Sequence, residues 1–351
     1  MGYAITTDGL GRMFGSRWAV RDLNLKIETG EVFGLLGPNG AGKTTIMRML
    51  SSLIAPTAGN ASVCDFDVVA QADQVRRHIG ILSEPAGLYD NLPARRNLEY
   101  FAKLYDLDPT FARKQIQKYL QLFGLWDRKD DLAGTFSRGM KQKLSLARSL
   151  LHEPAVVILD EPTSALDPEG AKLVRDSIIA LQGEGRTIIL CTHNLAEAQL
   201  ICTRVGIVKR TLIRVGTPRE LQEALYGRQI EIKIGNPLPH MGDVSTLDER
   251  LGRTMNDFAL LATRMRGVGD VAVSGSSLLV SMLDPDDFMP DLVRMLVLQG
   301  ADVIRVAEVE HSLERAYLDL VARQDLLDAQ AAAPMSSTVA PGGVRTGGAG
   351  Q

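Results

Sequence analysis

Short, largely apolar runs recur through the first 218 residues, and each ends at a turn. They occupy residues 32–36, 78–82, 155–159 and 187–192. Apolar runs of this length are typical of strands buried on both faces of a parallel sheet. Residues 5–27 read instead as short strands with turns, and residues 204–215 as a closing hairpin. The pattern predicts an α/β core over residues 1–218.

Between the second and third runs the apolar spacing becomes helical. In residues 97–107 and 111–123 apolar side chains recur three or four positions apart, as at Leu98, Phe101 and Leu104. That spacing lines one face of a helix, and no strand pattern separates the two segments. We therefore expect a small helical subdomain, at about residues 86–137, inserted into the α/β core.

The pattern changes again beyond residue 218. Strands are expected at residues 229–234, 268–273, 277–282 and 303–309, and helices at residues 258–265 and 287–298. This β-α-β-β-α-β order predicts a small α+β domain of the split βαβ, ferredoxin-like type over residues 219–327. The final stretch, residues 328–351, contains much alanine, glycine, serine and proline, and is expected to be a disordered tail.

Composition narrows the class of protein. The 351 residues are 45% hydrophobic and 23% charged with a net charge of −3, which suits roughly two soluble domains and gives no sign of a nucleic-acid partner. The first eight residues lack the pattern of a secretory signal, and no segment is long and apolar enough to cross a bilayer. The three scattered cysteines show no metal-ligand spacing and are expected to be buried, inert thiols in a reducing cytosol.

One stretch carries a clear chemical signature, and it directly follows the strand expected at residues 32–36. It fits the phosphate-binding pattern G-x-x-x-x-G-K-[ST] and precedes a helical run; its residues are Gly37, Pro38, Asn39, Gly40, Ala41, Gly42, Lys43, Thr44 and Thr45. Glycines allow successive N–H groups to face one concavity at the positive end of a helix. Lys43 would then bind the β and γ phosphates, and the Thr44 hydroxyl a magnesium ion.

Acidic and basic side chains follow two other expected strands. Asp160 and Glu161 end the run at residues 155–159, and His193 follows the run at residues 187–192. Because α/β sheets bind ligands at the carboxyl ends of their strands, Asp160 could reach magnesium and Glu161 could accept a proton from an attacking water. His193 could donate a hydrogen bond to a terminal phosphate, although a surface or capping histidine would show the same pattern.

Two further features are open to more than one interpretation. Phe14, before the turn at Gly15, could stack on an adenine ring or could belong to the core. Ser137 is a good N-cap for the helix that follows, and with Gly139 nearby it could mark either an ordinary capped helix or a second anion site.

Taken together, residues 5–218 resemble the nucleotide-binding subunit of ATP-binding cassette (ABC) transporters. The matching motifs occur in the family's order: Phe14 as the adenine-stacking aromatic, residues 37–45 as Walker A, 137–142 as the signature loop, 156–161 as Walker B, 164–167 as the D-loop and His193 as the switch histidine. The resemblance implies a P-loop ATPase fold, ATP and Mg²⁺ as cofactors, and hydrolysis with Glu161 as the base and Lys43 and His193 on the phosphates.

The resemblance also implies a paired site. ATP would lie between two cassettes arranged head to tail, most simply a homodimer, with Ser137 and Gly139 of one copy facing the Walker motifs of the other and Asp167 at the interface. Two positions depart from the commonest pattern. Glu84 stands where many members carry a glutamine that helps to bind magnesium, and the signature reads Ser-Arg-Gly-Met-Lys-Gln rather than Ser-Gly-Gly-Gln.

These departures, with residues 97–102, resemble the branch of bacterial exporters whose membrane permease is a separate chain. The resemblance places the protein in the cytoplasm, bound to the inner face of the membrane through that permease. Residues 311–318 look like the end of chains in this branch, and the region beyond residue 219 could be regulatory, could stabilise a dimer or could simply pack. The alternatives are a soluble cassette ATPase acting on ribosomes or DNA, for which a second cassette or a long coiled coil is missing, and a scaffold that binds ATP without splitting it.

Overall fold

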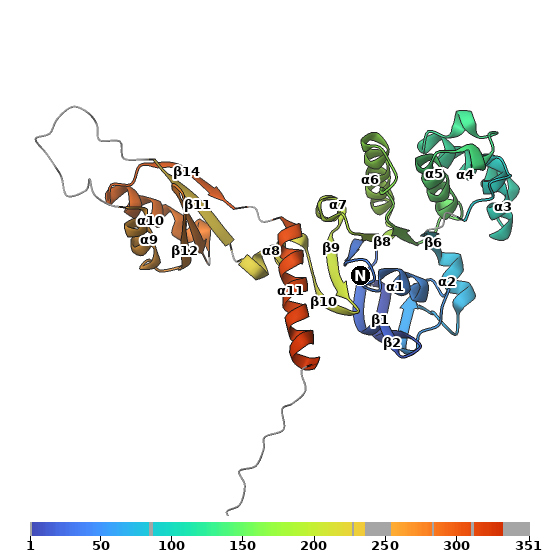
Figure 1. Cartoon of the computed structure of the whole chain (residues 1–351). Helices are drawn as coiled ribbons and strands as arrows, with labels where there is room; N and C mark the ends of the chain where they lie inside the picture. The colour runs from blue at the N-terminus through green and yellow to red at the C-terminus, as the bar shows by residue number, and fades with distance from the viewer. Residues whose placement is uncertain are drawn as a thin grey trace, which may run out of the picture.

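The structure, a computed structural model, describes residues 2–83, 87–226, 228–235, 254–282, 284–309 and 312–332. Its buried apolar side chains form three clusters. Two of them cover the opposite faces of one central sheet, and the third belongs to a separate sheet in the C-terminal region, which Figure 1 shows at a distance from the rest. Across the described ranges, no helix combines the length and the apolarity needed to cross a bilayer.

The central sheet contains six strands in the order β10-β9-β3-β8-β7-β6. All neighbours are parallel except β9 and β10. The strands are β3 (Val32–Leu36), β6 (Ile79–Leu82), β7 (Val156–Asp160), β8 (Thr187–Thr192), β9 (Arg204–Lys209) and β10 (Thr211–Gly216). The four apolar runs of the sequence are therefore β3, β6, β7 and β8, and the hairpin expected at residues 204–215 is β9 and β10.

A second sheet covers one face of the central sheet. It is antiparallel, in the order β2-β1-β4-β5, and contains β1 (Tyr3–Phe14), β2 (Arg17–Glu28), β4 (Ala58–Val63) and β5 (Phe66–Asp67). Helices α1 (Lys43–Leu50) and α2 (Ala72–His78) belong to the same side. Val156 and Ile158 of β7 point into the buried cluster between the two sheets, whereas Val157 and Leu159 point into the cluster on the opposite face of the central sheet. This is the period-two alternation of a strand.

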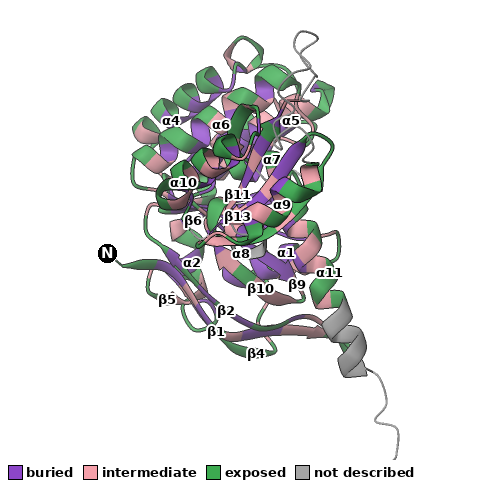
Figure 2. Ribbon diagram, turned by 90° about the vertical axis from the view of Figure 1, so that its left-hand side faces the viewer, coloured by how far each residue is buried: buried purple, intermediate pink, exposed green. Residues whose placement is uncertain are grey.

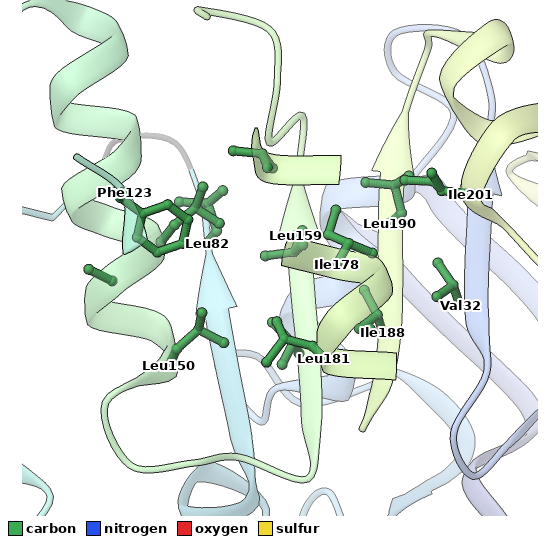
Figure 3. Close-up of a cluster of buried hydrophobic side chains, with 14 of the residues drawn as sticks. Val32, Leu82, Phe123, Leu150, Leu159, Ile178, Leu181, Ile188, Leu190 and Ile201 are labelled. Atoms are coloured by element: carbon green, nitrogen blue, oxygen red, sulfur yellow. The ribbon is translucent and has the colours of Figure 1, made fainter. Parts of the chain in front are cut away.

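Helices cover the other face of the central sheet. They are α3 (Ala94–Leu104), α4 (Pro109–Leu122), α5 (Arg138–Leu150), α6 (Pro168–Gly183) and α7 (Leu195–Ile201), with 3-10 turns η1 (Trp126–Arg128) and η2 (Ala133–Thr135). Figure 3 shows Leu150 and Ile178 facing Leu159 and Leu190 of the sheet. The helical insertion is present, and α3 begins three residues earlier than its apolar spacing indicated because Pro93 stands at its N-cap.

The C-terminal region has its own small sheet and core. Its elements follow the order β11 (Arg228–Ile234), α9 (Met255–Thr263), β12 (Val268–Ser274), β13 (Ser277–Met282), α10 (Pro285–Leu298) and β14 (Val303–Glu308). The sheet order is β12-β13-β11-β14, and every pair of neighbours is antiparallel. Ile230, Ile232 and Ile234 point from β11 toward α9 and α10 and are almost fully buried.

Two helices, one before and one after that small sheet in the chain, pack against the main body. They are α8 (Pro218–Tyr226) and α11 (Leu313–Ala332), which lie beside each other and beside β10 in Figure 1. Leu221 of α8 and Leu313 and Leu320 of α11 join the helical cluster of the central sheet. Residues 328–332, which we expected in the tail, belong to α11, because the helical run continues through them; residues 333–351 lie outside the described residues. Figure 2 shows the buried stripes of β1 and β2 beside exposed positions on the same strands.

Candidate functional site

The loop between β3 and α1 is held closely by two neighbouring strands. Gly42, the N-cap of α1, has a φ of 105°, and a Cβ placed on it would lie 2.6 Å from the carbonyl oxygen of Ala19 in β2. A Cβ on Gly37 would lie 2.4 Å from the carbonyl oxygen of Val208 in β9. Neither position has room for a side chain, so the two glycines allow the loop to nest between these strands.

Lys43 lies over this loop and is buried, with 8% of its surface exposed. Its Nζ donates hydrogen bonds to the carbonyl oxygens of Gly37 at 2.6 Å and Pro38 at 3.2 Å. The ammonium group is therefore aimed across the concavity formed by the loop, where successive backbone N–H groups can bind an anion. This is the position that the sequence predicted for a phosphate-binding lysine.

The next residue of the loop meets the end of β7. The hydroxyl of Thr44 lies 3.4 Å from Oδ2 of Asp160. Within the described ranges, no group of three metal-ligating His, Cys, Asp or Glu side chains occurs. Magnesium in nucleotide sites commonly takes only one or two protein oxygens and completes its shell with phosphates and water. The hydroxyl and carboxylate of this pair fit such an ion.

Glu161 links the ends of β7 and β8. Its N–H donates to the carbonyl oxygen of Cys191 at 2.8 Å, and its φ of 46° is unusual for a residue with a Cβ. One carboxylate oxygen lies 2.6 Å from Nδ1 of His193 and also accepts the His193 N–H at 3.0 Å. The other accepts from the Thr192 hydroxyl at 3.3 Å. The histidine is thus neither a helix cap nor isolated, since Asn194 caps α7.

A cavity of about 550 Å³ joins most of these groups. Residues 38–45, Asp160 and Glu161 line one part of it, and Phe14 lines another. Phe14 is 50% exposed, so it is not a core residue, and the guanidinium of Arg12 lies 4.9 Å from its ring centroid. The volume is within the range usual for small-molecule sites. An aromatic ring and a phosphate-binding loop in one cavity suit a nucleotide.

The sequence did not reveal every residue of this cavity. The additional lining residues are Arg17, Trp18, Ala19 and Arg210. The first three begin β2, and Arg210 forms the turn between β9 and β10, where it has a φ of 61°. A charged residue in a turn belongs to no motif. The only local signal is the pair of cations, Lys209 and Arg210, at the turn of the expected hairpin.

Five of the expected site residues that the structure describes lie outside the cavity lining: Gly37 and His193, which adjoin it in the chain or through Glu161, and Ser137, Gly139 and Asp167. Ser137 caps α5 by accepting the Met140 N–H at 3.2 Å, and Asp167 caps α6 by accepting the Gly170 N–H at 3.0 Å. At Gly139 an added Cβ would lie 3.1 Å from the carbonyl oxygen of a residue in the 164–167 loop. The start of α5 and this loop are therefore neighbours, but the single chain does not bring them into the cavity. Glu84 lies outside the described residues.

Burial alters the acidity of groups next to the site. Desolvation raises the pKa of the Cys191 thiol well above its usual value and that of Cys202 to about 12, so both thiols stay protonated, as expected for inert cysteines. Desolvation also raises the pKa of Glu197, while a hydrogen bond from the Thr163 hydroxyl at 2.9 Å opposes the shift. Glu197 ties α7 to the segment that follows Glu161.

A parallel sheet with a phosphate loop on one central strand and an acidic pair on another defines a P-loop nucleotide-binding fold. The comparisons with known proteins are more specific. A protein family described as "ABC transporter" matches residues 20–164. A daunorubicin resistance ATP-binding protein of Streptomyces coeruleorubidus is 42% identical over 230 residues, which span 65% of this chain and 73% of that protein.

A second relative covers nearly the whole chain. A Nod factor export ATP-binding protein of Rhizobium sp. (strain N33) is 33% identical over 323 residues, which span 92% of this chain and 98% of that protein. A solved ATP-binding subunit of an ABC transporter aligns with a TM-score of 0.61 and 26% identity, covering 64% of this chain and 94% of that one. The chain belongs to the ATP-binding proteins of ABC transporters, and it is an ATPase with the P-loop α/β fold of that family.

Proposed function

We propose that this chain is the subunit that binds and hydrolyses ATP in a membrane exporter whose permease is a separate protein. The proposal rests on one observation: Lys43, Thr44, Asp160 and Glu161 line the same cavity, where the Thr44 hydroxyl lies 3.4 Å from Asp160. The names of the relatives support export as the direction, since one concerns resistance to daunorubicin and another the export of Nod factor.

Each side chain of the cavity has a role in the proposed reaction. Phe14 stacks on adenine with the ring face that Arg12 leaves open, and Lys43 binds the β and γ phosphates. Thr44 and Asp160 would hold Mg²⁺, which supplies charge neutralisation at the phosphates when bound. Glu161 accepts a proton from the attacking water.

His193 serves Glu161 as well as the phosphate. Nδ1 of the imidazole lies 2.6 Å from the carboxylate, and this contact orients the ring. Nε2 remains for the γ phosphate, with which it can form a hydrogen bond only when it carries a proton. With 67% of its side chain exposed, the histidine can turn toward a bound nucleotide. Gln142 of α5 supports Glu161 from behind, because its Nε2 donates to the Glu161 carbonyl oxygen at 3.2 Å.

A second copy of the chain would complete the site. Ser137, Gly139 and Asp167 line no part of the cavity of their own chain, and α5 and α6 start close to each other. In a head-to-tail homodimer these helix starts would face the γ phosphate held by the other copy, where exposed N–H groups stabilise an anion. Closure of such a dimer on ATP and its opening after hydrolysis would supply the movement that drives transport.

A groove between the two layers offers a docking place for the permease. Its volume is about 710 Å³, and both the core and the helical layer contribute to its walls, including Leu53 and Arg77 on one side and Leu104 and Tyr105 on the other. Leu53 is 57% exposed and Leu104 61% exposed. Ser83, just after the end of β6, also lines it, and we infer that a permease segment binds here.

We infer a division of the chain that follows this function. Residues 1–218 form the ATPase domain, with the helical subdomain at about 86–137, and residues 219–327 form an accessory domain of the ferredoxin-like type. The strand order β12-β13-β11-β14 supports that type. A regulatory or dimer-stabilising role suits a domain with its own core. The permease would hold the protein at the inner face of the membrane, in the cytoplasm.

The test is nucleotide binding by the purified full-length chain. We expect the protein to bind ATP with Mg²⁺, and Lys43→Ala to weaken that binding by at least about tenfold, because it removes a charge-assisted contact to two phosphates. Lys118→Ala, at an exposed lysine on α4, is the matched control and should bind normally. Equal binding by Lys43→Ala would contradict the proposal, as would purification with ribosomes in place of a membrane protein.

A further inference from the structure

An arginine beside the phosphate loop has no part in the chemistry described so far. Arg210 forms the turn between β9 and β10 and lines the same cavity as Lys43 and Phe14. Its φ of 61° places it in the left-handed region, which costs free energy for any residue with a Cβ. Such strain persists only where the surrounding structure holds the backbone in place, and it often occurs at binding and catalytic sites.

The backbone of this turn is fixed from two sides. The Arg210 N–H donates to the carbonyl oxygen of Ala41 at 2.8 Å, and the Arg210 carbonyl oxygen accepts the Arg21 N–H at 2.7 Å. One bond ties the turn to the phosphate loop and the other ties it to β2. The start of the Arg210 side chain is therefore held between the loop and the strand that carries Trp18 and Ala19.

Among the described residues, no acidic side chain forms an ion pair with Arg210. Over the ranges that the structure describes, the guanidinium groups of Arg17 and Arg210 have no carboxylate partner, whereas the neighbouring Lys209 pairs with Asp325 of α11. Arg210 is exposed at the wall of the cavity rather than turned into the core. An unpaired guanidinium at a cavity that takes a polyphosphate is well suited to bind one of its phosphate groups.

We propose that Arg210 contacts the nucleotide and that its guanidinium binds the α phosphate of ATP. The inference rests on the proposed ATP-binding function. Lys43, Thr44 and Asp160 mark the end of the cavity for the β and γ phosphates, and Phe14 and Trp18 mark the end for the base. Arg210 is tied to Ala41, which lies in the loop between these ends. The anionic group of a nucleotide between the base and the β phosphate is the α phosphate.

The experiment compares Mg-ATP and Mg-ADP binding by calorimetry in full-length variants. Arg210→Gly removes the side chain but accepts the left-handed backbone without strain, so the bond to Ala41 is retained. We expect its affinity for ATP and for ADP to fall by the same factor, about fivefold to tenfold, because both nucleotides carry the α phosphate. Arg210→Lys, which keeps the charge, should recover part of the loss, and the melting temperature of Arg210→Gly should not fall.

The control is Arg214→Ala, at an exposed arginine of β10 that does not line the cavity, and it should bind both nucleotides normally. Unchanged binding by Arg210→Gly would overturn the inference, and so would a loss confined to ATP, which would place the contact at the γ phosphate. If the wild type binds ATP and Lys43→Ala does not, the proposed function stands even when Arg210→Gly behaves as wild type.

Discussion

Nδ1 of His193 lies 2.6 Å from a carboxylate oxygen of Glu161, although the two residues are 32 positions apart in the chain. The ends of β7 and β8 bring them together, since the two strands are parallel neighbours and Asp160 is paired with Cys191. The contact leaves one polar atom of each side chain for other partners. Removing the negative charge of Glu161 therefore tests the base without removing the residue that orients His193.

Glu161→Gln should bind ATP normally and hydrolyse it at least about a hundredfold more slowly, because an amide cannot accept a proton from water. The amide oxygen can still accept the His193 N–H, so the local structure should be retained. Steady-state ATPase assays and nucleotide binding on the same preparation measure both quantities. Glu169→Gln, at an exposed acid of α6, is the control; wild-type turnover in Glu161→Gln would exclude this residue as the base.

The groove should bind a permease through its apolar walls. Leu53→Asp and Leu104→Asp place a charge on leucines that are already exposed, so we expect little effect on folding or on ATP binding and a loss of affinity for the permease of about tenfold or more. The measurement is co-purification with the membrane protein encoded by the adjacent gene. Leu200→Asp, at a leucine that is 73% exposed and outside the groove, should associate normally. Equal association of all three variants would mean that the permease binds elsewhere.

Because of His152, we expect the free energy of unfolding to fall in acid. Burial lowers the pKa of its imidazole to about 4, because desolvation disfavours the charged ring, whose Nδ1 is buried without a hydrogen-bond partner among the described residues. The contact of Nε2 with the Ile79 carbonyl oxygen at 2.9 Å opposes this shift. The unfolded chain, with a pKa near 6.5, binds more protons, so this contribution to stability is complete above pH 6.5 and is lost as the pH falls toward 4. Since the ring is partly exposed, we expect about 1 to 2 kcal/mol.

Denaturant unfolding at several pH values measures this effect. His152→Phe retains a ring to stack on Tyr105, whose centroid lies 3.9 Å from that of the imidazole. The variant lacks the titrating group, so its stability should change less between pH 4 and pH 6.5, even though the loss of the hydrogen bond lowers its stability throughout. Identical slopes in the two proteins would show that His152 does not titrate in this range.

Helix α11 should stabilise the ATPase core from the far end of the chain. Leu313 is fully buried in the helical cluster, and its N–H donates to Oε1 of Gln199 in α7 at 3.3 Å. Leu313→Ala should lower the free energy of unfolding by about 2 to 3 kcal/mol, from lost burial and the cavity that remains. Leu318→Ala, on the same helix but 57% exposed, should change it by less than about 0.5 kcal/mol. Equal effects would mean that α11 does not contribute to the core.

Local patterns predicted much of the fold because apolar runs and turn residues directly determine strands. The runs at 155–159 and 187–192 became β7 and β8, and the order of elements beyond residue 228 follows the apolar alternation of the sequence. Helix α8 was missed as part of the core, since its packing on α11 depends on residues about ninety positions away. No local pattern encodes such a contact.

The candidate site likewise contains residues that a local motif predicted and residues that depend on packing between distant segments. Lys43 and Thr44 were identified from a motif whose spacing is fixed by phosphate geometry, and the cavity contains both. Arg17 and Arg210 were missed, because only the packing of two turns against the loop brings them to its wall. The positions of Ser137 and Gly139 outside the cavity could not be predicted from spacing either. A motif does not indicate whether its residues contribute to a site in their own chain or in a second copy.

The small C-terminal sheet is attached at both ends: α8 leads into it from the core and α11 returns from it to the core. A shortened protein that ends at residue 218 would therefore lack Leu221, Leu313 and Leu320, which belong to the buried cluster of the core. Joining α8 directly to α11 by a short linker would remove the sheet and keep these leucines. Excision of the sheet with its two helices α9 and α10, rather than truncation at residue 218, is therefore the way to learn what this part of the chain adds.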